Sequence, residues 1–272
     1  MSKTTTKLLT IEADPKTVKG EKAGYMTAVM YLIPADGASA ETLCPMAELA
    51  KCKAPCLLTA GRGGMAAGNA TFTTPSGTVL PDNAVQHARL RRTEFFLTDQ
   101  QGFMEQLVAE IRAFIKRAIQ AGLLPAVRLN GTSDIRWEDV RFSWAKAGWS
   151  RSGAMYTIFE MFPDIQFYDY TKIPNRYRAL RVPNYHLTFS YSHVPEFAPI
   201  VAKALQTYGD RINYAVVFST KRGRELPEVF LGRHVVDGDD TDLRFLDARR
   251  VVVGLRAKGR ARKDASGFVV MA

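Results

Sequence analysis

The sequence predicts an α/β protein, a partial (β/α) barrel of mostly parallel strands with helices on the outside. Three observations support this fold class. Strand-like apolar segments alternate with helical stretches, at least four such strands occur within 272 residues, and polar side chains gather directly after four of them. A doubly wound open sheet is the alternative. In both architectures, ligands bind beyond the carboxyl ends of the strands.

The composition is that of an ordinary globular protein, with 46% hydrophobic and 24% charged residues. No stretch approaches the roughly 18 consecutive apolar residues of a membrane span, and the first residues lack the apolar core of a secretory signal. We therefore expect a cytoplasmic protein with no membrane association. The 37 Lys and Arg residues exceed the 27 Asp and Glu residues, which gives a net charge of +10. This balance favours an anionic partner such as nucleic acid, a nucleotide or phosphate.

The first part of the chain begins with a polar segment, residues 1–24, which we expect to be flexible, and residues 25–272 are expected to form one barrel-like domain. Residues 25–33 are typical of a strand and end at a Pro-Ala-Asp-Gly turn. Residues 57–84 are rich in Gly, Thr, Ser and Pro, and predict a long loop. A helix is predicted from an N-cap at Asp99 to Gly122, because apolar residues recur at helical spacing between them.

The rest of the chain repeats a strand-and-helix pattern. Strands are predicted at residues 125–129, 164–168, 185–190 and 212–218, and helical stretches at 151–161, 174–180 and 196–208. The polar clusters that follow the four strands are Asn130–Asp134, Asp169–Lys172, Ser190–His193 and Ser219–Lys221. Turns are polar in most proteins, but four consecutive clusters favour a polar site built from loops at one edge of the sheet.

All three cysteines, Cys44, Cys52 and Cys56, fall within thirteen residues. An odd, clustered set is a poor disulfide framework, and clustered thiols in a reducing compartment more often bind metal. Three thiolates suit a [4Fe–4S] cluster with one open iron position. Zinc is the direct alternative, with a fourth ligand from the four histidines, His87, His186, His193 or His234. Buried, inert thiols are the third possibility.

Several segments resemble the bacteriophage gene product 88 family. They are Cys44–Gly63, Ala88–Thr93, Val127–Asp134, Phe167–Lys172 and Val235–Asp239, and the resemblance covers about residues 40–268. The likeness implies a phage or prophage origin, and therefore the cytoplasm of the host as the compartment.

A more distant resemblance is to radical S-adenosylmethionine enzymes, which are partial β/α barrels with a three-cysteine [4Fe–4S] loop after the first strand. Their usual spacing is C-x3-C-x2-C, whereas this chain has C-x7-C-x3-C. The likeness implies a cluster on Cys44, Cys52 and Cys56 that reductively cleaves S-adenosylmethionine to act on an unknown substrate. It also implies cofactor-binding positions after the strands: Asn130, Gly131, Thr132 and Ser133 for the methionine part, and Asp169, Lys172, Ser190 and Ser192 for the rest of the cofactor and for substrate.

The alternative function is a non-catalytic, nucleic-acid-binding phage protein in which the cysteines hold a structural zinc or no metal. Basic stretches at residues 88–92 and 249–263 favour it, as do six aromatic residues in the middle third of the chain: Trp137, Trp144, Trp149, Tyr168, Tyr170 and Tyr177. The carboxylate-rich turn at residues 235–242 suggests a divalent cation or a solvated turn. No dinucleotide fingerprint, Walker lysine motif or Gly-x-Ser-x-Gly elbow occurs.

Overall fold

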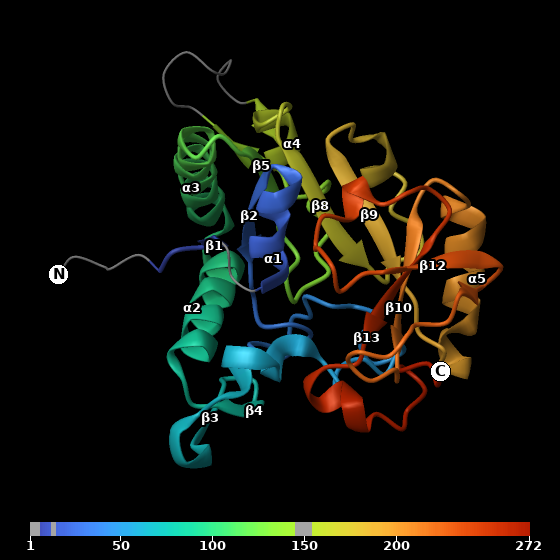
Figure 1. Cartoon of the computed structure of the whole chain (residues 1–272). Helices are drawn as coiled ribbons and strands as arrows, with labels where there is room; N and C mark the ends of the chain where they lie inside the picture. Colours follow the sequence, from blue (N-terminus) through green and yellow to red (C-terminus); the bar gives the residue numbers. More distant parts are fainter. Residues whose placement is uncertain (1–5, 12–14, 145–153) are drawn as a thin grey trace.

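A computed structural model describes residues 6–11, 15–144 and 154–272 of the chain. They form a mixed α/β fold around one mostly parallel sheet of nine strands (Figure 1). The strand order across the sheet is β1 (Leu9–Ile11), β2 (Tyr25–Met30), β5 (Leu124–Arg128), β8 (Gln166–Thr171), β9 (Tyr185–Ser190), β10 (Asn213–Phe218), β13 (Val252–Arg256), β12 (Arg233–Asp237) and β11 (Val229–Phe230).

Six neighbouring strands, from β2 through β13, are parallel and lie in the sheet in the order of the sequence. A doubly wound sheet reverses its strand order at a switch point. The six strands show no reversal, but β12 also pairs parallel with β13 and lies beyond it, out of sequence order. The strands β1 and β11 lie at opposite ends of the sheet and are not paired with each other in the described part of the chain. The structure therefore shows an open, mostly parallel sheet, and the predicted barrel is not closed.

The longest helix, α3 (Gln100–Gln120), packs its apolar side chains into the main core beside the sheet. Its N-cap is Asp99, whose carboxylate accepts a hydrogen bond from the Gly102 backbone N–H at 2.9 Å. It ends before Gly122, which has a φ of +70° that favours glycine. The predicted helix between residues 99 and 122 is thereby confirmed.

The two faces of the sheet differ in what covers them. The first face, which we call the helix face, packs on α2 (Ala84–Thr98), α3 and α5 (Ala198–Tyr208), and carries apolar residues such as Val127 and Phe189. The other face, here the loop face, carries Arg128 and Tyr168. Leu243 and Phe245 pack against it. Figure 1 shows α2 and α3 to one side of the sheet, α5 at its other end, and the short helix α1 (Pro15–Lys19) beside β2.

The N-terminal segment differs from the expected flexible tail, because residues 9–11 form β1, which pairs antiparallel with β2. Leu8 is fully buried, and its backbone N–H and that of Leu9 donate to the carboxylate of Glu110 on α3 at 2.9 Å. Two buried apolar side chains, Leu8 and Leu9, and a half-buried acceptor, Glu110, therefore attach this polar segment to the fold.

The predicted loop at 57–84 contains short 3-10 turns and an antiparallel hairpin of β3 (Thr71–Thr73) and β4 (Val79–Pro81). The helix α2 that follows was not predicted. Its buried positions include Gln86, Arg89 and Thr93, so no apolar periodicity marks it in the sequence.

The three helical stretches predicted after residue 150 had different outcomes. Residues 196–208 are confirmed as a 3-10 turn followed by α5, whereas 174–180 holds only the start of a 3-10 turn at Ala179–Arg181. In the stretch 151–161, residues 151–153 lie outside the described residues, and the remainder forms β7 (Met155–Tyr156), which pairs with β6 (Phe142–Ser143), and the short α4 (Ile158–Met161). No helix in the described part of the chain is both long enough and apolar enough to cross a membrane.

Candidate functional site

The three cysteines lie in residues 43–56, which we call the cysteine segment. This segment comes after β2 and runs along the carboxyl edge of the parallel strands, as the course of the chain below the sheet in Figure 1 shows. Segments that follow two other strands hold it there. The Asp134 backbone N–H, after β5, donates to the Leu43 carbonyl at 2.8 Å, and the Ser192 hydroxyl, after β9, donates to the Ala50 carbonyl at 2.9 Å. The thiols therefore lie at the edge where parallel sheets bind ligands.

The three thiols are unbridged and share one region. The Cys44 thiol donates to the Thr132 carbonyl at 3.7 Å, and the Cys56 sulfur accepts the Leu58 backbone N–H at 3.4 Å. Burial raises the pKa of all three thiols, and the negative charges of Asp134, Cys56 and Cys52 further raise the pKa of Cys44. Buried thiols with raised pKa values are protonated at neutral pH and are poor nucleophiles.

The sulfur atoms are not arranged as a coordination sphere. Across residues 6–11, 15–144 and 154–272, no three His, Cys, Asp or Glu side chains form a group that could hold a metal ion. Of the histidines, His87 pairs with Asp82 at 2.7 Å, and the ring of His193 contacts the Tyr191 hydroxyl at 2.9 Å. The geometry therefore shows proximity of the cysteines, and the ligand set remains a prediction.

Two buried cations lie beside the thiols. Lys172 is 8% exposed, and its ammonium donates to the carbonyl and hydroxyl of Ser190 at 2.9 and 3.0 Å. Burial lowers the pKa of Lys172, and the negative charges of Cys52, Asp134 and Cys44 oppose that shift. The positive charge of this residue is thus placed against two of the three cysteines.

The second cation is Arg89 on α2, which is 7% exposed. Its Nη1 donates to the Leu58 carbonyl at 2.6 Å, its guanidinium lies over the Tyr31 ring at 5.2 Å, and its Nε has no hydrogen-bond partner. Burial lowers the pKa of Arg89, and the acidic groups that oppose this are Tyr31 and Cys56. No carboxylate in the described part of the chain forms an ion pair with this arginine. Sequence reasoning placed Arg89 in an exposed basic stretch and missed it.

The side-chain polar atoms of the predicted cofactor residues after β5 form hydrogen bonds within the protein. The Asn130 side-chain oxygen accepts from the Ser133 hydroxyl, the Ile135 backbone N–H and the Trp137 ring N–H, and its amide donates to the Ile135 carbonyl at 3.0 Å. The Thr132 hydroxyl donates to the Leu32 carbonyl. This turn therefore ties β5 to the chain between β2 and the cysteine segment.

Gly131 is required by the close approach of this turn to β2. A Cβ atom on Gly131 would lie 2.5 Å from the Met30 carbonyl oxygen and 2.7 Å from the Tyr31 ring. The Gly131 backbone N–H donates to that same carbonyl at 2.9 Å. Any side chain here would push the turn away from the edge of the sheet.

Asp169, predicted to bind ribose, is fully buried within the fold. Its carboxylate accepts the Asn130 backbone N–H at 2.7 Å and the Tyr185 hydroxyl at 2.8 Å. Burial raises the pKa of Asp169 to about 7, although these hydrogen bonds act in the opposite direction. Ser190 and Ser192 are likewise engaged, with Lys172 and with Ala50. Thr132 and Ser192 contact the cysteine segment, whereas the hydrogen bonds of Asp169 go to Asn130 and Tyr185, and the polar atoms of these residues hold the edge together.

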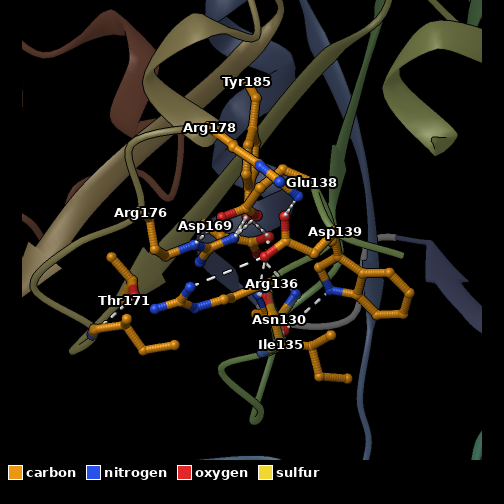
Figure 2. Close-up of polar contacts among 12 residues, drawn as sticks. Asn130, Ile135, Arg136, Glu138, Asp139, Asp169, Thr171, Arg176, Arg178 and Tyr185 are labelled. Carbon is orange, nitrogen blue, oxygen red and sulfur yellow. Dashed lines mark hydrogen bonds and ion pairs between the residues drawn. The ribbon is translucent and has the colours of Figure 1, made fainter. Parts of the chain in front are cut away.

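A buried ion network lies next to Asp169. The side chain of Arg176 is fully buried, and its guanidinium makes two bonds to the Glu138 carboxylate, at 2.9 and 2.5 Å (Figure 2). It also lies 3.6 Å from an Asp134 oxygen. It also donates to the Tyr185 hydroxyl at 3.0 Å. Since Tyr185 donates to Asp169, one network joins the segments after β5 and β8.

A cavity of about 460 Å³ opens beside this network. It lies between the segments that follow β5 and β8, and three of its lining residues are arginines. The lining residues are Arg136, Glu138, Asp139, Asn175, Arg176, Tyr177 and Arg178. None of the predicted cofactor residues lines it. The sequence offers Lys172 or Arg176 as a ligand for a substrate phosphate; only Arg176 lines this cavity, and its side chain is buried in the network.

The predicted nucleic-acid groove is not assembled from the residues expected to form it. Trp137, Trp144 and Tyr168 are buried, whereas Tyr177 is 55% exposed, and Trp149 lies outside the described residues. Within the basic stretches, Arg89 is buried, and residues 260, 262 and 263 are exposed. Buried rings are unavailable for stacking on bases.

The carboxylate-rich turn at residues 235–242 is used by the protein's own cations. Asp237 and Asp239 pair with Arg256 at 2.7 and 3.4 Å, and Asp242 pairs with Arg128 at 3.0 Å. With these carboxylates already neutralised, the expected divalent-cation site is not formed.

Comparison with known proteins gives one match. Neither the curated proteins nor the solved structures include a match to this chain, so the resemblance to radical S-adenosylmethionine enzymes finds no support there. The family described as gene product 88 matches residues 2–272. The chain therefore belongs to the gene product 88 family.

Proposed function

We propose that Cys44, Cys52 and Cys56 hold a thiolate-bound metal centre, and that this centre is a [4Fe–4S] cluster whose open iron position takes S-adenosylmethionine. The observation that carries the proposal is the pair of buried cations beside the thiols. Arg89 faces only Tyr31 and Cys56 among the acidic groups that act on its pKa, and Lys172 faces Cys52, Asp134 and Cys44.

The argument rests on charge balance. A buried cation without a counter-ion costs several kcal/mol. If the thiols stay protonated, Arg89 has no negative partner in the described part of the chain. Thiolates bound to a metal would place negative charge beside both cations, and the raised thiol pKa values would then be overcome by the metal.

The donor set favours a cluster over zinc. A structural zinc site closes with four protein ligands. No histidine is among the groups that act on the pKa values of the three thiols, so a zinc site would need the Asp134 carboxylate, which acts on Cys44 and Cys52, as its fourth ligand. When bound, a [4Fe–4S] cluster on three cysteines supplies one-electron reduction and an iron with an open position.

The fold supports this assignment in two ways. Six of the seven neighbouring parallel strands follow one another in sequence order, which we interpret as a partial barrel, and the cysteine segment comes directly after the first of them. We assign the residues predicted for the cofactor to the walls of the site, where their contacts position the cysteine segment. Asn130, Gly131, Thr132, Ser133 and Asp169 shape the edge after β5, and Lys172, Ser190 and Ser192 shape the edge after β8 and β9.

The three free thiols also support a reducing compartment, the cytoplasm of the host for a phage-encoded chain.

The test is anaerobic purification followed by iron, sulfide and zinc analysis and a visible spectrum before and after dithionite. We expect about four irons and four sulfides per chain and a visible band that dithionite bleaches. Cys44→Ala, Cys52→Ala and Cys56→Ala should each lose the metal. Chains with one zinc or no metal would overturn the cluster and favour the non-catalytic alternative.

A second variant tests the charge argument directly. Arg89→Met should release the metal faster to a chelator than the unmodified protein, because the thiolates lose a buried counter-ion. Arg91→Met, on the exposed side of the same helix, is the matched control and should retain the metal normally. Equal retention in both variants would contradict the role given to Arg89.

A further inference from the structure

The residues that line the cavity between the segments after β5 and β8 include more arginines than carboxylates, and Asp134, which is not among them, lies 3.6 Å from Arg176. The three arginines of the cavity, Arg136, Arg176 and Arg178, face two carboxylates, Glu138 and Asp139. Arg176 is matched by Glu138 in the buried network. The two remaining arginines therefore share Asp139.

That sharing is unequal. Arg178 donates to an Asp139 oxygen at 3.0 Å, whereas the Arg136 Nη1 lies 3.9 Å from the other oxygen. The other amino group of Arg136 donates to the Asn175 side-chain oxygen at 2.7 Å, which orients the guanidinium. An oriented guanidinium with a loosely held counter-ion is suited to bind a phosphate oxygen pair.

An aromatic ring lies at the same cavity. Tyr177 is 55% exposed, and its hydroxyl contacts the Thr207 hydroxyl at 3.3 Å, so the ring is held at the surface. Exposed aromatic faces stack on bases of any sequence. The cavity volume of about 460 Å³ is within the range of small-ligand sites.

We propose that this cavity binds the phosphate group of a nucleotide, with Arg136 and Arg178 on the phosphate and Tyr177 beside the base. The site is built from the segments that follow β5 and β8 in the chain, next to the buried network of Arg176. It does not depend on a metal at the cysteines. The nucleotide is either free or one unit of a single strand, and the phosphate chemistry is the same in both.

The experiment is calorimetric titration of the full chain with inorganic phosphate, a nucleoside monophosphate, the matching nucleoside and a short single-stranded oligonucleotide. We expect the monophosphate to bind more tightly than inorganic phosphate, and the nucleoside to bind at least tenfold more weakly than the monophosphate. Arg136→Ala and Arg178→Ala should each weaken monophosphate binding about tenfold or more. Arg181→Ala, an exposed arginine three residues from Arg178 that does not line the cavity, should bind like the unmodified protein.

The outcomes separate the possibilities. Tighter binding of the oligonucleotide than of the monophosphate, with the same dependence on Arg136 and Arg178, identifies a strand as the source of the phosphate. Weaker binding of the strand identifies a free nucleotide. No binding of the monophosphate, or an equal loss in Arg181→Ala, would overturn the site. Since none of these titrations requires iron, a failure here is distinguishable from a failure of the cluster.

Discussion

The buried ion pair of Arg176 and Glu138 allows a sharp test of how burial changes the value of a salt bridge. The chain contains a second pair of almost the same length at its surface. Arg176 and Glu138 approach to 2.5 Å with side chains 0% and 2% exposed, whereas Lys53 and Glu48 approach to 2.6 Å with side chains 41% and 75% exposed. The perturbation is the same in both pairs, replacement of the glutamate by glutamine.

The expected magnitudes differ because water solvates only the surface pair. Removing one partner of a buried pair typically costs about 3–5 kcal/mol, whereas an exposed pair contributes about 0–1 kcal/mol. Asp134 remains 3.6 Å from Arg176 in the Glu138→Gln variant, so part of the arginine charge stays compensated. We therefore expect a loss near the lower limit, about 3 kcal/mol, for Glu138→Gln and less than about 1 kcal/mol for Glu48→Gln.

The assay is urea unfolding followed by tryptophan fluorescence, with the free energy of unfolding taken from the midpoint and slope. Thermal unfolding gives a second readout, in which about 3 kcal/mol corresponds to roughly 6–12 °C for a chain of this size. Losses of equal size in the two variants would refute the reasoning, because burial would then have no effect on the pair.

Three further predictions concern stability. Because the pKa of Asp169 is raised to about 7, the folded protein binds this proton more tightly than the unfolded chain. The resulting stabilisation is complete below about pH 4 and is lost as the pH rises to about 7. Over this range the free energy of unfolding falls by at most about 1.4 kcal/mol per pH unit. The difference in unfolding free energy between the unmodified protein and Asp169→Asn should fall over this range, and a difference that is constant with pH would contradict it. Gly131→Ala should lower the free energy of unfolding by about 1–3 kcal/mol, since its Cβ would meet the Met30 carbonyl; an unchanged urea midpoint would show that the turn moves freely. Asp99→Ala should cost about 0.5–2 kcal/mol through loss of the α3 cap, whereas Asp99→Asn, which keeps the acceptor, should cost less; equal losses would argue against the cap.

Much of the fold was predictable because the parallel strands are continuous apolar segments. The strands β2, β5, β8, β9 and β10 overlap the predicted ones, and α3 has a clear cap, stripe and stop. The helix α2 was missed because Gln86 and Arg89 occupy its buried side, where they bind backbone carbonyls of the segment after the cysteines. Tertiary contacts, not periodicity, explain that helix.

The candidate site was predictable in position but not in roles. The close spacing of Cys44, Cys52 and Cys56 singled out the cysteines, and the positions of Asn130 and Asp169 at the ends of predicted strands singled out these two residues. Nothing in a linear sequence shows that the side-chain oxygen of Asn130 accepts hydrogen bonds from its own turn, or that Arg89 on α2 lies near Cys56. The Arg136 and Arg178 cavity was missed because its two sides come from segments about forty residues apart.

The order of the parallel strands also bears on how the chain folds as it leaves the ribosome. From β2 to β10, each parallel strand pairs with the parallel strand made before it, so this part of the sheet grows at one edge during synthesis, whereas β13 is made after β12 and lies between β10 and β12. The residues that cover the loop face are synthesised later. Arg128 receives its partner Asp242 only after 114 further residues have been made. Until then Arg128 lacks this counter-ion, so residues 242–245 cannot cover the loop face before the last part of the chain is made.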